Sequence, residues 1–157
     1  MKQKIDYFNI PEIVVTFRDN FVTAERDCIN KPEDAVKIFQ KIFKDFVEHH
    51  EEFWAMYLNG GGRVIGVQQI AKGGADKVQV DTRMVLQAAV KCNATAIILC
   101  HNHTNNVCFP SESDINSFMS DKQGLANAGF VLWDNLIITK DKWYSFKKSN
   151  IFELCNQ

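Results

Sequence analysis

A short apolar run near the middle of the chain constrains the fold most. Residues 94–100 read ATAIILC, which is the longest apolar stretch in the sequence. It is far shorter than the ~20 residues that a membrane-spanning helix needs. A strand with no polar alternation is typical of a sheet that is covered on both faces. We therefore expect a buried strand at residues 95–100, with other elements packed on each side of it.

Three segments have the three- and four-residue apolar spacing of an amphipathic helix. The spacing predicts helices over residues 32–50, 82–91 and 111–127. Asp81 is placed to cap the second helix, and Gly129 is placed to end the third. The side chains of the third helix that we expect to face inward are Ile115, Phe118, Met119 and Leu125.

Strands are predicted where β-branched and aromatic residues gather between turn residues. Besides residues 95–100, these segments are residues 13–17, 53–58, 63–70, 130–138 and 143–146. The turn Asn59-Gly60-Gly61-Gly62 joins two of them into a hairpin. Strands that alternate with helices indicate an α/β fold, a mixed β-sheet flanked by helices. No repeat, low-complexity tract or linker divides the sequence, so we expect residues 1–157 to form one domain.

Charge and cysteine usage limit the classes of function. The chain has 18 Lys and Arg against 19 Asp and Glu, a net charge of −1. It therefore has no overall attraction to nucleic acid or to an anionic membrane. The first residues lack the apolar core of a signal peptide, and the five cysteines form no CxxC pair. Scattered cysteines of odd number are typical of reduced thiols, so we expect a cytoplasmic protein.

Chemically active side chains are concentrated directly after the buried strand. His101 and His103 are two residues apart, and in extended backbone such side chains point to the same side. Asp114 lies in the first turn of the helix that begins at Ser111, from where its carboxylate can point back to the strand end. Two imidazoles and one carboxylate leave the fourth position of a zinc site open, as in catalytic zinc centres.

Each part of this pattern also has a plainer interpretation. A His-x-His pair is common on protein surfaces, and Ser111-x-x-Asp114 is close to an ordinary capping box. The capping and metal-binding interpretations are compatible, because a cap can fix the helix end that directs Asp114. Cys108 offers a soft ligand in the same loop, which would give a His-His-Cys site instead.

The complete spacing is more specific than its parts. His-x-His, seven residues and Ser-x-x-Asp form the core of the JAMM (MPN+/JAB1) metalloprotease motif. The segments ATAIILCHNH, FPSESDI and DNLIITKDKWYSF resemble the RadC family of bacterial proteins, as do EEFWAMYLNGGGRVIG and the stretch GGADKVQVDTRMVLQAAVKCNA. The resemblance is firmest over residues 32–148 and implies the JAB/MPN, cytidine deaminase-like architecture. The helix-hairpin-helix segment of full-length RadC proteins is not seen, so the chain looks like the short stand-alone form.

The resemblance implies a role for each site residue. One zinc ion per chain would be held by His101, His103 and Asp114. Glu51 matches the family's Glu-x-Phe and would be the general base, although a shift of one residue would give that role to Glu52. Ser111 would donate a hydrogen bond to the reacting oxygen.

Three positions depart from the family pattern. Thr104 follows the His-x-His pair where Pro is usual, and Asn105-Asn106-Val107 replaces a common Ser-Gly-Asp or Ser-Gly-Asn. Asp134-Asn135 stands where an Asp-His pair is common. None of these changes removes a ligand, so they bear on loop shape and on substrate fit.

Two functions follow from these observations. The first is a zinc-dependent hydrolase that cleaves a peptide or isopeptide-like amide of an unknown protein or peptide substrate. The second is an accessory module in DNA repair or mobile-element biology that acts through a partner protein or DNA. Lysines near aromatic residues after position 139 could bind single-stranded nucleic acid. We favour the alternative that the aromatic residues pack in the core and the lysines are solvated.

Overall fold

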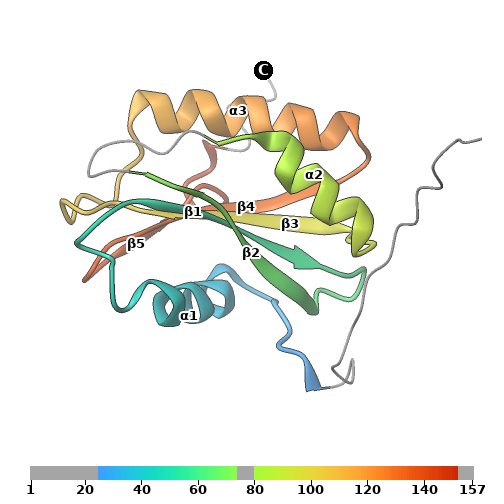
Figure 1. The fold of residues 1–157 in the computed structure, drawn as a ribbon, viewed down its shortest axis with the longest axis horizontal. Helices are drawn as coiled ribbons and strands as arrows, with labels where there is room; N and C mark the ends of the chain where they lie inside the picture. Colours follow the sequence, from blue (N-terminus) through green and yellow to red (C-terminus); the bar gives the residue numbers. More distant parts are fainter. Residues whose placement is uncertain (1–24, 74–79, 152–157) are drawn as a thin grey trace, which may run out of the picture.

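The computed structural model describes residues 25–73 and 80–151. The strand predicted at residues 13–17 lies outside these ranges. Within them the chain forms three helices and five strands (Figure 1). In chain order the elements are α1 (Pro32–Phe43), β1 (Glu52–Leu58), β2 (Val64–Lys72), α2 (Thr82–Lys91), β3 (Ala96–Asn102), α3 (Glu112–Asn127), β4 (Val131–Ile138) and β5 (Trp143–Ser145).

The strands form one mixed sheet in the order β2-β1-β3-β4-β5. β1 and β2 pair antiparallel as the predicted hairpin. β3 lies at the centre, antiparallel to β1 and parallel to β4. This central place explains its continuous apolar sequence, because both of its faces are covered.

Helices cover both faces of the sheet. α1 packs on one face, and α2 and α3 lie on the other (Figure 1). Side chains of β3 alternate between the two resulting cores: Ile97 and Leu99 face α2 and α3, while Ile98 and Cys100 face α1. The structure thus confirms the α/β class and the mixed sheet flanked by helices.

The first helix is shorter than its sequence pattern predicts. α1 ends at Phe43, and residues 44–49 form turns. The apolar spacing continues because Phe46 and Val47 still pack against the α1-side core. The carbonyls of Val47 and His50 accept hydrogen bonds from the buried Asn102 amide, at 3.0 and 2.8 Å. A tertiary contact therefore holds this segment where the periodicity predicted more helix.

The second and third helices begin where the sequence predicts. The Asp81 side chain accepts from the backbone N–H of Arg83 at 3.0 Å and caps α2. Ser111 is the N-cap of α3, and Gly129 adopts a left-handed φ of 85° just beyond its end. The prediction for Met119 was wrong: its side chain is 45% exposed.

The aromatic residues near the C-terminal strands contribute to packing. Phe146 is fully buried in the core, and the ammonium of Lys147 lies 3.7 Å from the centre of the Trp133 ring. The four cysteines in the described ranges are free thiols. No helix in those ranges has both the length and the apolar character needed to cross a bilayer.

Candidate metal centre

Two histidines and an aspartate meet at the end of β3. The Nε2 atoms of His101 and His103 are 3.0 Å apart. Asp114 Oδ1 lies 3.2 Å from Nε2 of His101, and Asp114 Oδ2 lies 3.3 Å from Nε2 of His103. Within the described ranges these residues form a group able to hold one metal ion, and Cys108 is not a member of it.

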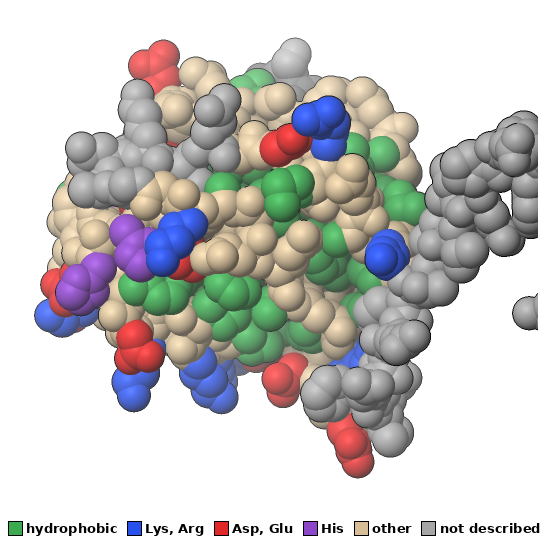
Figure 2. Space-filling model, in the orientation of Figure 1, with side chains coloured by type: hydrophobic (Ala, Val, Ile, Leu, Met, Phe, Trp, Pro, Cys, Tyr) green, Lys and Arg blue, Asp and Glu red, His purple; other side chains and the backbone are tan. Residues whose placement is uncertain are grey.

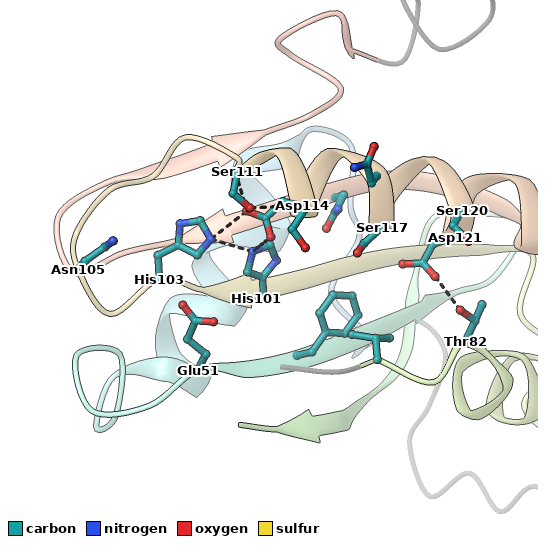
Figure 3. Close-up of a pocket in the computed structure, with 15 residues that line it drawn as sticks. Glu51, Thr82, His101, His103, Asn105, Ser111, Asp114, Ser117, Ser120 and Asp121 are labelled. Carbon is teal, nitrogen blue, oxygen red and sulfur yellow. Dashed lines mark hydrogen bonds and ion pairs between the residues drawn. The ribbon is translucent and has the colours of Figure 1, made fainter. Parts of the chain in front are cut away.

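The strand and the helix each contribute a local reason for this meeting. β3 continues through Asn102, further than the sequence predicted, because His101 pairs with Phe53 of β1 and Asn102 pairs with Ile138 of β4. The His101 ring therefore points to the side of the sheet that α3 covers (Figure 3). The His103 ring is fixed by a 2.7 Å contact between its Nδ1 and the carbonyl of Val107.

Asp114 is held by the capping box at the start of α3. Its Oδ2 accepts from the backbone N–H and the hydroxyl of Ser111, both at 2.7 Å. The Ser111 hydroxyl in turn accepts from the N–H of Asp114 at 3.1 Å. The capping and metal-binding interpretations of Ser111-x-x-Asp114 are thus compatible in the structure, because the cap directs the carboxylate toward both histidines.

The donor set fits zinc. In a tetrahedron with Zn–N bonds of ~2.0–2.1 Å, ligand atoms lie about 3.3 Å apart. The separation of 3.0 Å between the two Nε2 atoms is close to that edge, and each of these nitrogens lies 3.2 or 3.3 Å from a different oxygen of Asp114, so the carboxylate is within reach of an ion held by both rings. The Val107 contact occupies Nδ1 of His103 and leaves its Nε2 lone pair for a metal. The Nδ1 atom of His101 is buried and has no hydrogen-bond partner among the described residues.

Close packing also shifts the pKa values of His103 and Asp114. Burial by itself would lower the pKa of His103, but the hydrogen bonds to Asp114 and to the Val107 carbonyl outweigh it and raise that pKa. Burial opposes ionisation of Asp114 too, yet contacts with both histidines hold its pKa well below the usual range.

The adjacent residues Glu51 and Glu52 point to opposite faces of the sheet. Glu51 lines the same cleft as His101 and His103 and is directed toward them (Figure 3). Its negative charge contributes to the raised pKa of His103. Its carbonyl accepts from the N–H of Gly73 at 2.9 Å, which extends the β1–β2 pairing by one step. The structure therefore places Glu51, and not Glu52, beside His101, His103 and Asp114.

Glu52 is part of a buried network under α1. Its carboxylate lies 2.7 Å from Nε2 of His50 and accepts from the Trp54 indole at 2.8 Å. Its backbone N–H donates to Oδ1 of Asn102 at 2.8 Å. Burial opposes the charge of Glu52, but the His50 and Trp54 hydrogen bonds lower the pKa of the carboxyl overall. Glu52 and Asn102 thus have structural partners on the face away from the metal centre.

A cleft runs from the metal centre along α3. It is lined by Glu51, Phe53, Val80, Thr82, His101, His103, Asn105, Ser111, Ser113, Asp114, Asn116, Ser117, Ser120, Asp121 and Asn135. Histidine side chains gather at one end of the face shown in Figure 2, where charges of both signs are interspersed. Sequence reasoning did not single out Thr82 or Asp121, because polar residues on a helix normally indicate only its solvated face.

Comparison with known proteins places the chain in a family. Residues 29–151 match the model of the RadC-like JAB domain. The UPF0758 protein of Flavobacterium johnsoniae is 37% identical over 124 residues, which is 79% of this chain and 53% of that protein. The UPF0758 protein of Porphyromonas gingivalis is 37% identical over 119 residues, or 76% and 52%. That of Aquifex aeolicus is 30% identical over 126 residues, or 80% and 53%.

The chain spans about half the length of these relatives. The matched region contains the whole of the described sheet, its three helices and the His101, His103 and Asp114 group. This chain therefore belongs to the RadC-like JAB domain family.

Proposed function

We propose that this protein is a zinc-dependent hydrolase of the JAMM type that cleaves a peptide or isopeptide-like amide bond. The observation that carries the proposal is the convergence of Glu51 and Ser111 on the group His101, His103 and Asp114 within one cleft. A zinc ion bound by that group would lower the pKa of a coordinated water toward ~7 and polarise the substrate carbonyl.

Glu51 would move the protons of the reaction. It would accept a proton from the attacking water and deliver it to the amine that leaves. Glu51 is directed toward His103 but is not one of the three residues that could hold the metal, and this position suits the task. Glu52 is unsuited to it, because the residue is 3% exposed and its carboxylate is hydrogen-bonded to His50 and Trp54.

Ser111 would stabilise the negative oxygen that forms at the substrate carbonyl. Preorganised donors of this kind are large contributors to catalysis. The Ser111 hydroxyl now donates to Asp114 Oδ2, which also accepts from the backbone N–H of Ser111 at 2.7 Å. The hydroxyl can therefore turn toward a substrate while the backbone bond still holds the carboxylate.

The accessory DNA-binding alternative gains no support from the cleft. Of the fifteen described residues that line it, none is Lys or Arg. Among these residues phosphate groups would find no Lys or Arg partner, and proteins that bind DNA without sequence preference rely on such contacts. We therefore propose a protein or peptide as the substrate.

The first test is metal content, measured by plasma mass spectrometry on protein purified without a metal-affinity tag. We expect about one zinc per chain in the wild type and none in His103→Ala. Peptide and isopeptide substrates would then be screened with Glu51→Ala as the inactive control. If the wild type binds no zinc after zinc addition and dialysis, the hydrolase proposal is wrong.

A further inference from the structure

The end of the cleft remote from the metal centre contains a buried carboxylate that the proposed reaction does not use. Asp121 follows Asp114 by seven residues on α3, so both lie on one face of the helix, about 10.5 Å apart along its axis. Its side chain is 6% exposed and lines the cleft with Ser117 and Ser120 (Figure 3). The two aspartates thus mark the two ends of one cleft.

Hydrogen bonding satisfies only part of this carboxylate. The hydroxyl of Thr82 donates to Asp121 Oδ1 at 2.7 Å. The other oxygen points along the cleft on the side of Ser117 (Figure 3). Burial raises the pKa of Asp121, and the Thr82 hydrogen bond only partly opposes this rise. Among the described residues, the lining of the cleft contains no Lys or Arg that could pair with Asp121, so this carboxylate is open to a cation supplied by a ligand.

A second polar group in the cleft lacks a partner. Asn135 is 3% exposed, and its Oδ1 atom has no hydrogen-bond partner among the described residues. It lies on β4 in register with Leu99, two residues before His101 on the neighbouring strand. A buried carbonyl oxygen without a donor is costly, and a backbone N–H of a bound peptide would supply that donor.

We propose that this end of the cleft is a subsite for a lysine or arginine side chain of an extended peptide, with Asp121 as its anion. An extended chain advances about 3.3 Å per residue, so the ~10.5 Å between Asp114 and Asp121 corresponds to about three residues. A peptide that follows α3 would therefore carry its cationic residue about three positions from the bond cleaved at the metal centre. This inference rests on the proposed function, because it takes the metal centre as the place of cleavage.

A purely structural role for Asp121 predicts something different. The Thr82 hydrogen bond joins α2 to α3, and Asn at position 121 can still accept it. Asp121→Asn therefore removes the charge and keeps the hydrogen bond between α2 and α3. Thr82→Val removes this hydrogen bond and keeps the charge of Asp121. Glu112→Gln is the matched control, because Glu112 is an exposed acid of the same helix outside the cleft lining.

The experiment measures binding, so that it does not depend on turnover. Zinc-loaded Glu51→Gln protein is titrated with fluorescent Ala/Gly decapeptides that carry one lysine, or one norleucine of similar length, at each position in turn. Fluorescence anisotropy gives the affinity ratio of each pair. We expect lysine to bind about tenfold more tightly than norleucine at one position, as for a charge-assisted hydrogen bond. The ratio should fall to about one in Asp121→Asn and persist in Glu112→Gln and Thr82→Val.

Three results would overturn the subsite: no position with a lysine preference, a preference that persists in Asp121→Asn, or no binding of any peptide. The proposed function is tested separately by cleavage with the wild type. Cleavage without a lysine preference would support the hydrolase proposal and contradict the subsite. A lysine preference that depends on Asp121, without cleavage of any peptide, would support the subsite and contradict the hydrolase proposal.

Discussion

The two faces of the sheet treat neighbouring polar residues in opposite ways. On the α1 face, the amide of Asn102 accepts from the N–H of Glu52 and donates to the carbonyls of Val47 and His50. On the other face, Glu51 and His101 line an open cleft. Glu51 and Glu52 are adjacent in sequence, and so are His101 and Asn102. Because successive side chains of an extended backbone point to opposite faces, each pair contributes one residue that stabilises the fold and one that remains available for chemistry.

Exchange of the two glutamates for glutamine tests this division most strongly. Glu51→Gln should lower turnover about 100- to 10,000-fold, because a general base is lost, while zinc content stays unchanged. Glu52→Gln should keep turnover within a few fold and lower the free energy of unfolding by about 1–3 kcal/mol, as expected for a buried acceptor that loses a partner. Peptide cleavage and urea denaturation of both variants measure the two effects. Equal loss of turnover in both would contradict the division.

Ser111→Gly tests whether the capping residue also acts on the substrate. Turnover should fall about 100-fold, as for the loss of one oxyanion donor. The fold should lose only a few tenths of a kcal/mol, since Gly is a tolerated N-cap. Kinetics on a cleaved peptide, with thermal melts of the same samples, separate the two quantities. Unchanged turnover would leave Ser111 with the cap alone.

On the α1 face, Asn102→Ala should affect stability. The change leaves the N–H of Glu52 and the carbonyls of Val47 and His50 without their partner. We expect unfolding free energy to fall by about 2–4 kcal/mol, because unsatisfied buried groups are among the costliest substitutions. Urea denaturation of chelator-treated protein measures this loss without a contribution from metal binding.

Asn127→Ala is the control for that experiment. Asn127 is exposed at the end of α3 and accepts from Gln123 at 2.8 Å. Its loss should change the unfolding free energy by no more than about 0.5 kcal/mol. If the two alanine variants were equally stable, the Asn102 network would not contribute to the fold.

The smallest effect concerns the pH dependence that Asp121 adds. Because burial raises the pKa of Asp121 in the folded state above its usual value of 3.8, the protonated form is favoured by folding. Its stabilising contribution is therefore complete below the unfolded-state pKa and is lost as the pH rises through the folded-state pKa. The contribution of Asp121 to the stability of the wild type should therefore fall from pH 4 to pH 7, and the free energy of unfolding of Asp121→Asn should increase relative to that of the wild type over the same range. Urea denaturation at both pH values measures this gain, and a decrease would exclude burial as the cause.

Much of the fold could be predicted because its signals are local. The bounds of α2, the existence of the hairpin and the position of the central strand follow from caps, turns and apolar patterns within short windows. The meeting of His101 with His103 could also be predicted, since their two-residue spacing places both side chains on one side of an extended backbone. The capping box fixes Asp114 at the helix start whatever surrounds it.

Other features required the tertiary structure. The pattern of residues 32–50 did not reveal that α1 ends at Phe43, because the following turns bury apolar side chains with similar spacing. The choice between Glu51 and Glu52 depends on the phase at which β1 joins β3, and a shift of one residue exchanges the two faces. The sequence pattern alone places Asp121 among the polar residues of α3, and only the packing of this helix in the tertiary structure buries it.

The sequence by itself determined the α/β class, the family and the residues able to hold a metal. These can be predicted from residue patterns and spacings within short stretches of the chain. Only the tertiary structure decided which glutamate faces the metal centre and what lies at the remote end of the cleft. Those features depend on the strand alignment between Phe53 and His101 and on the packing of Thr82 against Asp121, which join residues 48 and 39 positions apart.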